Sequence, residues 1–334
     1  LLKGTDGSKE YIKDAVGYQI ENVYTIDPVS GSDIYLTLDS QIQLILENAV
    51  ATLSSNNTYS WFTISVMNAK TGAIVGSASS PSFDPNTLSG LKSYVNPLVG
   101  YTYEPGSTMK IFSFLAAMEN GIYNGSDTFM SGNTSVQGYS IFDFNRVGWG
   151  KIDYDTGFYY SSNVAATNLG LKLGNDKLTD FYKSVGFGAK TGIELPGEEY
   201  GIIKMQRPIE LANAAFGQGV TTTPIQTLQA LSILTNDGVM LKPYIVDKIV
   251  DEKGNVTYEG KRTELGQKVS SESVNKMKDL MYGVVYKGLS KSWQPNNVHL
   301  AGKTGTAQIA SPKGGYLSGA NDYIRSFAGI FPYE

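Results

Sequence analysis

Apolar residues near the start of the chain repeat first at helical and then at strand spacing. One set lies three and four positions apart, as on a single helix face: Ile42, Ile45, Leu46, Ala49, Val50 and Leu53. Asp39 precedes this set and is placed to cap the helix. Residues 61–67 and 73–78 are β-rich runs joined by the turn residues Asn68 and Gly72. We therefore predict a short strand at 35–39, a helix and then a β-hairpin.

The most apolar predicted helix runs from about Ser107 to Asn120. A Pro-Gly pair precedes it and a glycine ends it. Its side chains are apolar on nearly every side, which is typical of a buried helix. Lys110 is its only charged residue before Glu119, and a lysine in such surroundings needs an explanation.

The rest of the chain predicts a helix-rich middle and a β-rich end. The predicted elements are a polar linker at 1–30, short helices and loops at 122–160, a helix starting within 161–174, a loop at 186–198, a helix from Thr223 to about 238, a hairpin at 243–260, a helix at 270–289 and strands at 299–310 and 322–331. Strands at both ends around helices indicate a mixed α/β (α+β) architecture.

Composition narrows the possible functions of this chain of 334 residues. Its hydrophobic content of 41% with 17% charge is that of a folded globular protein. The net charge is −4 and no basic run stands out, so we do not expect a nucleic acid as a partner. There is no apolar stretch of about 18 residues that would predict a membrane span.

Cysteine is absent and histidine occurs once, at His299. These counts exclude thiolate nucleophiles, disulfides and Cys/His zinc sites, and we expect no metal and no cofactor. A Ser-His-Asp triad would have to use His299. Otherwise the base for covalent catalysis must be a Lys, Asp, Glu or Tyr.

Ser107 and Lys110 lie three residues apart at the start of the apolar helix, so they project from one face. Backbone N–H groups at a helix start can bind an oxyanion. A lysine among apolar side chains is poorly solvated, which favours its neutral, basic form. The alternative is that Ser107 caps the helix and Lys110 extends to the surface.

Three short motifs in the order S-x-x-K, S-x-N and K-T-G extend this pattern. They are Ser107 to Lys110, Ser161 to Asn163 and Lys303 to Gly305, the trio found in penicillin-binding proteins and class A β-lactamases. Residues 31–331 resemble class B penicillin-binding proteins, monofunctional D,D-transpeptidases, of the Gram-positive division type. The stretches that carry the resemblance are EPGSTMK, FNRVGWG, YSSN, GFGAKTGIELPGE, AAFGQGVTTTPIQ, NDGVMLKP and GKTGTAQ.

The resemblance implies catalytic roles for four of these residues. Ser107 would attack the penultimate D-Ala carbonyl of a peptidoglycan stem peptide, and Lys110 would take its proton. Ser161 would relay a proton to the departing D-Ala. Asn163 would hold Lys110 and the substrate amide.

The resemblance also implies a substrate-binding strand. Lys303 would supply positive charge, and Thr304 and Thr306 would bind the terminal carboxylate of D-Ala or of a β-lactam. Gly305 belongs to the same motif, and Gln308 is a further candidate for a substrate contact. The backbone N–H groups of Ser107 and Thr306 would form the oxyanion hole.

The fold implied by the resemblance is that of penicillin-binding-protein transpeptidases and serine β-lactamases, an antiparallel sheet flanked by helices plus a helical subdomain. We expect residues 1–30 to be the tail of an N-terminal pedestal or linker. Residues 31–334 would be the transpeptidase domain without its C-terminal strand and helix. The expected location is the extracytoplasmic face of the bacterial membrane, with an N-terminal transmembrane anchor absent from this chain.

The implied partners are peptidoglycan stem peptides, as D-Ala-D-Ala donor and amine acceptor, and β-lactam antibiotics. A membrane glycosyltransferase and other division proteins are expected as well.

The alternatives to the transpeptidase function are a β-lactamase or β-lactam sensor, a D,D-carboxypeptidase and a non-catalytic division scaffold. A class A lactamase needs a glutamate that activates water, and the nearest match to that motif is Glu210. Two more KTG copies, at 70–72 and 190–192, are predicted to be a hairpin turn and a loop.

Overall fold

The computed structural model describes residues 2–56, 59–288, 294, 295, 297–317, 319 and 321–333. In chain order its elements are β1 Ser8–Lys13, β2 Gln19–Ile26, β3 Asp33–Leu36, α1 Ser40–Asn56, β4 Phe62–Met67, β5 Ile74–Ser80, α2 Pro97–Gly100, the 3₁₀ turn η1 Gly106–Met109, α3 Lys110–Glu119, β6 Thr128–Met130, β7 Asn133–Val136, β8 Tyr139–Phe142, β9 Lys151–Asp153, α4 Tyr154–Tyr159, α5 Asn163–Leu173, α6 Asn175–Ser184, α7 Pro208–Ala215, α8 Pro224–Thr235, β10 Val239–Leu241, β11 Val246–Val250, β12 Val256–Glu259, β13 Glu264–Gln267, α9 Ser271–Tyr286, β14 Ala301–Gln308 and β15 Tyr323–Ile330. Within these ranges no helix is both long and apolar enough to cross a membrane.

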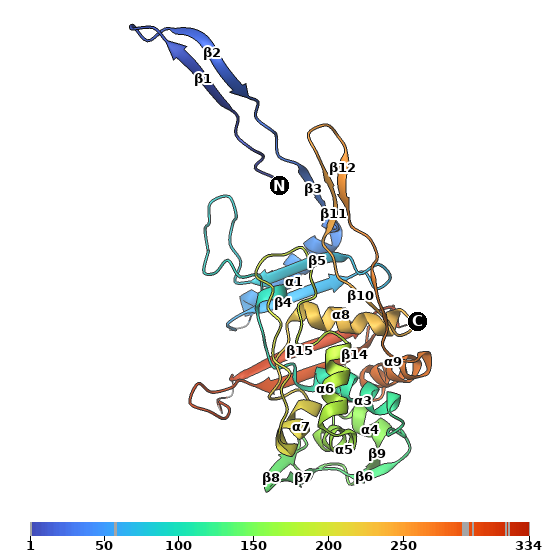
Figure 1. The fold of residues 1–334 in the computed structure, drawn as a ribbon. Helices are drawn as coiled ribbons and strands as arrows, with labels where there is room; N and C mark the ends of the chain where they lie inside the picture. Colours follow the sequence, from blue (N-terminus) through green and yellow to red (C-terminus); the bar gives the residue numbers. More distant parts are fainter. Residues whose placement is uncertain are drawn as a thin grey trace.

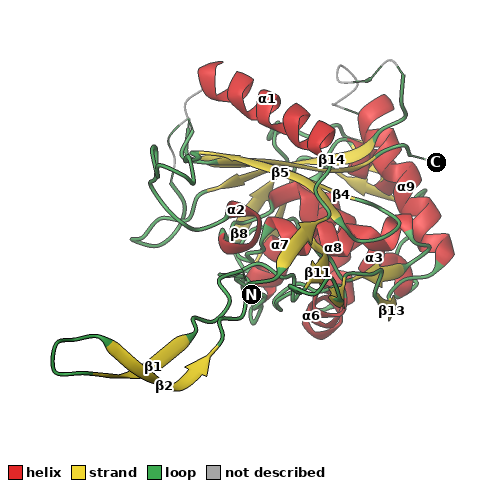
Figure 2. Cartoon of the chain, turned by 90° about the horizontal axis from the view of Figure 1, so that it is seen from above, coloured by secondary structure: helices red, strands yellow, loops and turns green. Residues whose placement is uncertain are grey.

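Two antiparallel ribbons and a helical lobe make up most of the molecule (Figure 1). Strand β4 pairs with β5, and α1 packs on β5 (Figure 2). Strand β14 pairs with β15 without a register shift, from Ala301–Ile330 to Gln308–Tyr323. Among the described residues these two ribbons are not hydrogen-bonded to each other. The predicted antiparallel sheet is therefore present as separate two-stranded ribbons.

Helix α3 lies in the main hydrophobic core, as its apolar pattern predicts. All its residues from Lys110 to Ala117 are buried, and it packs on α5, α6 and α9. Phe112 contacts Phe187, and Phe114 contacts Phe158, both edge to face with ring centroids 4.9 Å apart. This packing holds the N-terminus of α3, and with it Ser107 and Lys110, in a defined place.

The beginning of this helix differs from the prediction. Residues Gly106–Met109 form a 3₁₀ turn, and the α-helix itself starts at Lys110. The Thr108 hydroxyl donates to the Pro105 carbonyl at 2.8 Å, and this bond stabilises the tight turn. Ser107 therefore lies in a tight turn before the helix rather than at its first position.

Residues 122–160 were predicted as short helices and loops, and this prediction missed the strands that lie among them. Four short strands, β6 to β9, precede the only helix there, α4. Strands β7 and β8 form a hairpin whose turn residues Gln137 and Gly138 both have positive φ, 52° and 82°. Such turns favour Asn-Gly or Asp-Gly, so a Gln-Gly turn gave little signal.

Residues 1–30, predicted as a polar linker, contain the hairpin β1–β2, which projects from the molecule (Figures 1 and 2). Asp14 nucleates its turn, because one carboxylate oxygen accepts from the N–H groups of Val16 (2.9 Å) and Tyr18 (2.8 Å). Every residue of both strands is exposed. The segment is therefore an ordered but unburied ribbon, which its polar sequence did not predict.

Most other predicted elements are confirmed. Asp39 caps α1 by accepting from the N–H groups of Gln41 and Ile42 at 2.9 and 3.0 Å. Thr223 caps α8, the hairpin β11–β12 is present, and the two C-terminal strands pair. The helix predicted at 270–289 ends at Tyr286, and residue 289 lies outside the described residues.

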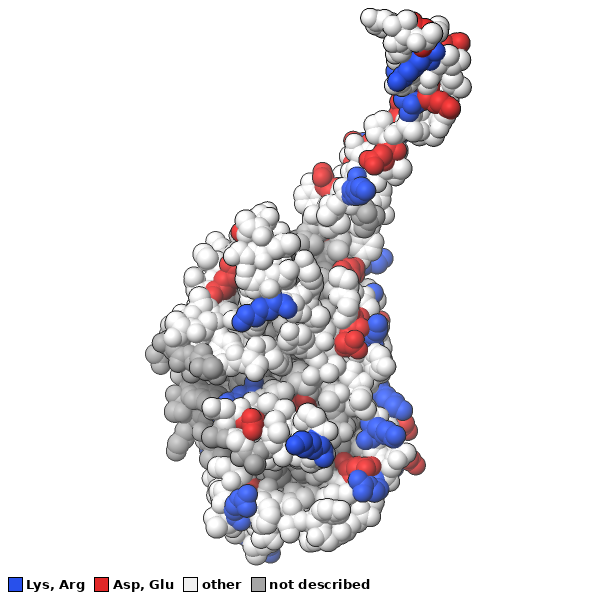
Figure 3. Space-filling view, turned by 90° about the vertical axis from the view of Figure 1, so that its left-hand side faces the viewer, with Lys and Arg blue, Asp and Glu red and all other residues white. Residues whose placement is uncertain are grey.

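Acidic and basic side chains are interspersed over the face drawn in Figure 3. No large patch of one sign covers that face. Nucleic-acid binding needs a continuous basic surface, and this face does not provide one.

Candidate active site

The site is built around the tight turn that carries Ser107. Gly106 has a φ of 55°, and its N–H donates to Gly217 at 3.0 Å. A Cβ atom on Gly106 would lie 3.0 Å from the carbonyl carbon of Thr306 in β14. The turn is thus held between the 217–219 loop and strand β14, with Ser107 half-buried beside both.

Lys110, one helical turn after Ser107, is fully buried and contacts the second predicted motif. Its ammonium nitrogen Nζ lies 2.6 Å from the Ser161 carbonyl, 2.7 Å from Asn163 Oδ1 and 3.3 Å from Ser161 Oγ. Within the described part of the chain, Lys110 makes no hydrogen bond to the Ser107 hydroxyl. The fold thus joins Lys110 to Ser161 and Asn163, and leaves the Ser107 hydroxyl free to approach a ligand.

Ser161 has an unusual backbone conformation, and its carbonyl oxygen and Oγ both accept hydrogen bonds from lysines. Its φ is 58°, in the left-handed region that a serine rarely adopts and that often marks a functional site. Lys303 Nζ donates to Ser161 Oγ at 2.8 Å. A serine hydroxyl can accept two hydrogen bonds and donate one. When both lysines are protonated, each can donate to one lone pair of this hydroxyl, and Ser161 keeps its proton available for a third group.

Both lysines have lowered pKa values. Burial is the main cause for Lys110, whose pKa lies well below the usual 10.5, and the positive charge of Lys303 lowers it further while Asp143 raises it. Burial lowers the pKa of Lys303 to about 7. A cation that shares the same hydroxyl thus adds to the effect of burial on Lys110. The lowered pKa increases the fraction of neutral Lys110, the form that can act as a base.

Asp143 is a site residue that sequence reasoning missed. Its carboxylate is buried and accepts from Ser162 Oγ (2.8 Å), Val164 N (3.1 Å) and Gly132 N (2.8 Å). It therefore fixes the start of α5, where Ser161 and Asn163 lie. The aspartate directly precedes the FNRVGWG stretch, but nothing in its spacing shows that it contacts the S-x-N motif.

Strand β14 presents the third predicted motif. Lys303 and Gly305 alternate with Thr304 and Thr306, so the two threonines share the opposite side of the strand. Thr304 is half-buried and Thr306 is exposed. Gln308 follows on the threonine side, and its Nε2 donates to the Leu317 carbonyl at 3.4 Å. The contact between Gly106 and Thr306 brings the two proposed oxyanion-hole segments together.

The other two KTG copies lie away from this cluster, as predicted. Asn68 Oδ1 accepts from Lys70 N and Thr71 N in the β4–β5 turn. In the second copy Thr191 N and Oγ1 donate to the Glu198 carboxylate, each at 2.6 Å. Only the third copy meets the buried lysine and the S-x-N loop.

Comparison with known proteins agrees with this geometry. The family model described as penicillin binding protein transpeptidase domain matches residues 62–334. The chain belongs to this family.

Named relatives of this transpeptidase domain are bacterial. Stage V sporulation protein D of Bacillus subtilis is 36% identical over 346 residues, which cover 100% of this chain and 53% of that protein. Penicillin-binding protein PbpB of Mycobacterium tuberculosis is 30% identical, over 99% of this chain and 51% of that protein. The chain thus spans about half the length of these relatives.

Solved structures confirm the fold. Penicillin Binding Protein 2X from Streptococcus thermophilus superposes with a TM-score of 0.89 at 31% identity, over 99% of this chain and 52% of that one. Penicillin binding protein 3 from Mycobacterium tuberculosis, complexed with ampicillin, gives 0.82 at 29% identity, over 92% of this chain and 71% of that one. The predicted penicillin-binding-protein fold and the class B resemblance are confirmed.

The transpeptidase domain does not use its glutamate motif as a lactamase would. Glu210 caps helix α7, accepting from Gln206 N at 2.8 Å and from Arg207 N at 3.0 Å. Hydrogen bonds from these N–H groups and from the Arg207 side chain lower its pKa to about 2. A carboxylate this acidic is a poor base for activating water at neutral pH.

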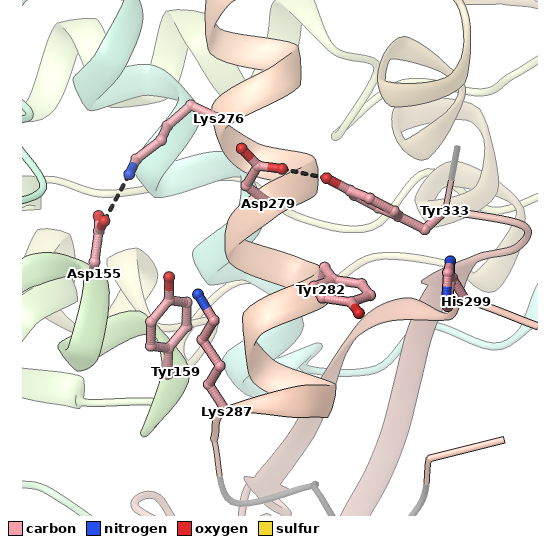
Figure 4. Close-up of a pocket in the computed structure, with 8 residues that line it drawn as sticks. All are labelled: Asp155, Tyr159, Lys276, Asp279, Tyr282, Lys287, His299 and Tyr333. Carbon is pink, nitrogen blue, oxygen red and sulfur yellow. Dashed lines mark hydrogen bonds and ion pairs between the residues drawn. The ribbon is translucent and has the colours of Figure 1, made fainter. Parts of the chain in front are cut away.

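His299 lies in a separate pocket of about 590 Å³ in this transpeptidase domain (Figure 4). Its ring packs edge-on against Tyr282, with centroids 6.0 Å apart. The carboxylates there are engaged, since Lys276 pairs with Asp155 at 2.6 Å and Tyr333 bonds Asp279. Among the described residues no serine lines the pocket, so they form no Ser-His-Asp triad there.

Proposed function

We propose that this domain is a serine-type peptidoglycan D,D-transpeptidase that cross-links stem peptides through an acyl-enzyme on Ser107. One observation carries the proposal most strongly: the buried Lys110, one helical turn after Ser107, and the buried Lys303 both contact Ser161. Membership in the transpeptidase family supports it.

Lys110 is the base in the proposed acylation. A neutral lysine has two N–H donors and one lone pair, and its two shortest contacts, to the Ser161 carbonyl and Asn163 Oδ1, occupy the donors. The lone pair then takes the Ser107 proton as Oγ bonds to the penultimate D-Ala carbonyl carbon. Burial lowers the pKa of Lys110, which increases the fraction of the chain that carries this neutral form.

The remaining groups stabilise charge and move the second proton. Lys303, Thr304 and Thr306 bind the terminal carboxylate, and Gln308 borders the same strand. The N–H groups of Ser107 and Thr306 hold the oxyanion, where loss of one donor typically costs about 2.7–4 kcal/mol. When the C–N bond breaks, Ser161 passes its proton to the leaving D-Ala nitrogen and takes the proton held by Lys110. An amine of a second stem peptide then bonds to the ester carbonyl carbon and gives a proton to Lys110. As the bond to Ser107 Oγ breaks, Lys110 returns that proton to Oγ and the free serine is restored.

The proposed ligands are stem peptides as donor and acceptor, and β-lactams, whose carboxylate and strained carbonyl match the same groups. A membrane glycosyltransferase and other division proteins are proposed partners. The proposed location is the extracytoplasmic side of the bacterial membrane, where peptidoglycan lies. We also propose residues 1–30 as the end of a pedestal and the residues from 31 onward as the transpeptidase domain.

Intact-protein mass spectrometry after incubation with benzylpenicillin tests this proposal. We expect one stable adduct on the wild-type chain and none on Ser107→Ala, while the exposed control Ser55→Ala still forms it. Folded wild-type protein without an adduct would contradict the proposal, and an adduct lost within seconds would favour a β-lactamase. A stem-peptide assay with and without an amine acceptor separates transpeptidation from carboxypeptidation.

A further inference from the structure

Glu104 lies three residues before the proposed nucleophile and has no role in the mechanism above. Its Oε1 atom accepts from the Gly219 N–H at 3.1 Å and from the Tyr316 hydroxyl at 3.3 Å. Its other oxygen, Oε2, is buried and has no hydrogen-bond partner among the described residues. Burial raises the pKa of this carboxyl, and the two hydrogen bonds oppose that effect. Burial of a carboxylate oxygen without a hydrogen-bond partner costs free energy, so we expect Glu104 to contribute to the site.

The Gly219 contact ties Glu104 to a loop that already touches the Ser107 turn. Gly106 N donates to Gly217 O, and a Cβ on Gly217 would lie 2.0 Å from the Gly106 carbonyl oxygen. The loop and the turn therefore meet backbone to backbone. Glu104 adds a second attachment two residues further along the loop.

The Tyr316 contact ties Glu104 to a small hairpin that continues β14. In this 309–317 hairpin, Leu317 N donates to Ile309 O at 2.9 Å and Ala310 forms a bridge with Tyr316. Gln308, on the proposed substrate strand, donates to Leu317. The position of the hairpin relative to Ser107 thus depends on contacts such as that of Tyr316 with Glu104.

We propose that Glu104 is a positioning residue for acylation, whose one carboxylate oxygen holds the 217–219 loop and the 309–317 hairpin against the Ser107 turn. This inference rests on the proposed function and adds a residue to it. Hydrogen bonds to a charged acceptor are stronger than neutral ones, so a carboxylate suits this junction. Neither Glu104 nor Tyr316 touches the reacting atoms in this role.

Four variants test the proposal: Glu104→Ala, Glu104→Gln, Tyr316→Phe and Tyr258→Phe. Tyr258 is the matched control, because its hydroxyl donates to a carboxylate, that of Glu194 at 3.1 Å, in a different part of the fold. The first measurement is the acylation rate with a fluorescent penicillin, resolved into initial binding and the chemical step. The second is hydrogen exchange of the 309–317 amides, which needs no catalysis.

Glu104→Ala is expected to slow the chemical step about tenfold with little change in initial binding, because about one charged hydrogen bond is lost from the positioned state. Exchange in the 309–317 hairpin should quicken in Glu104→Ala and in Tyr316→Phe. Glu104→Gln keeps an acceptor oxygen and should recover most of the rate. Tyr258→Phe should match the wild type in both measurements.

Unchanged hairpin exchange in Glu104→Ala would overturn the proposal, whatever the acylation rate. An unchanged chemical step, or a Glu104→Gln rate as low as that of Glu104→Ala, would overturn it too. A wild-type chain that is never acylated would refute the proposed function instead, and the exchange data would still decide whether Glu104 holds the hairpin.

Discussion

Two buried lysines meet at one serine hydroxyl in this molecule, and their burial lowers the pKa of each. Lys110 and Lys303 both reach Ser161 Oγ, at 3.3 and 2.8 Å. Water is excluded, so each charge is costly and each raises the cost of the other. One lysine can therefore be a base while the other remains an anchor for a carboxylate.

A plot of the acylation rate against pH should be bell-shaped. Both of its limbs should lie at lower pH than the ordinary pKa of lysine. The rate rises as Lys110 loses its proton, and its lowered pKa places this rise well below 10.5. The rate falls as Lys303 loses its charge, nearer pH 7 than pH 10, because its pKa is lowered to about 7. Stopped-flow acylation by a chromogenic β-lactam between pH 4 and 10 measures both limbs, which belong to the coupled pair.

Asp143→Asn serves as the test variant for this profile. The negative charge of Asp143 raises the pKa of Lys110, so its removal should move the acid limb to lower pH. The plateau should fall as well, because an amide in place of the carboxylate loses the bond from Gly132 N. A rate that keeps rising to pH 10, or an acid limb that moves upward in the variant, would rule out this assignment.

The three KTG copies show that the same tripeptide can have different roles in one chain. Thr191 in the second copy already binds a carboxylate, that of Glu198, through both its N–H and its hydroxyl. Thr304 is proposed to bind the carboxylate of a substrate with a similar hydroxyl. In the second copy Thr191 is already hydrogen-bonded to the internal Glu198 carboxylate. The third copy instead lies on the strand that contacts the Ser107 turn.

At the scale of elements, the site depends on the close approach of β14 to the Ser107 turn. Gly305 makes this approach possible, because a Cβ there would lie 2.5 Å from the Pro105 carbonyl oxygen and 2.3 Å from Ser326 Oγ. The Ser326 hydroxyl itself donates to Pro105 O at 3.2 Å, which joins β15 to the same turn. The K-T-G glycine is therefore required by packing between two elements.

Gly305→Ala should lower the acylation rate by about 100-fold, because the added methyl group must push the turn away from β14. The overpacking should also reduce the unfolding free energy by about 1–3 kcal/mol. Penicillin acylation and urea unfolding measure the two effects.

Gly302→Ala on the same strand is the control for that variant. Its Cβ meets mainly the end of the Phe327 ring, which is 49% exposed and can move aside. Near-wild-type acylation is expected. Equal losses in the two variants would show that any alanine in β14 is harmful and that the contact with Pro105 is not special.

At the scale of the whole molecule, the β1–β2 hairpin is separate from the core that supports the site. No residue of its strands is buried, and an isolated two-stranded hairpin is marginally stable in water. The helical lobe and the β14–β15 ribbon make their contacts without it.

Removal of residues 1–30 should therefore leave the site intact. We expect acylation within about twofold of the full chain and a Tm within about 2 °C, because little packing is lost. Differential scanning calorimetry and the fluorescent penicillin assay measure the outcome. A Tm lower by about 10 °C would show that the hairpin supports the domain.

The sequence by itself determined the family resemblance, the buried helix after Ser107 and the nine proposed site residues. These features are local: a repeat of apolar residues, a cap such as Thr223, or a motif a few residues long. Short strands such as β7 and β8 were missed, because their Gln-Gly turn carries no strong local signal and their pairing is decided by packing.

Tertiary structure alone decided which groups meet at the site. Asp143 holds the start of α5, Glu104 reaches Tyr316 across 212 positions, and Lys303 reaches Ser161 across 142. Residue spacing alone does not predict such contacts, because they depend on where distant elements pack. The lowered pKa of Lys110 has the same origin, since it comes from the burial that the folded core imposes.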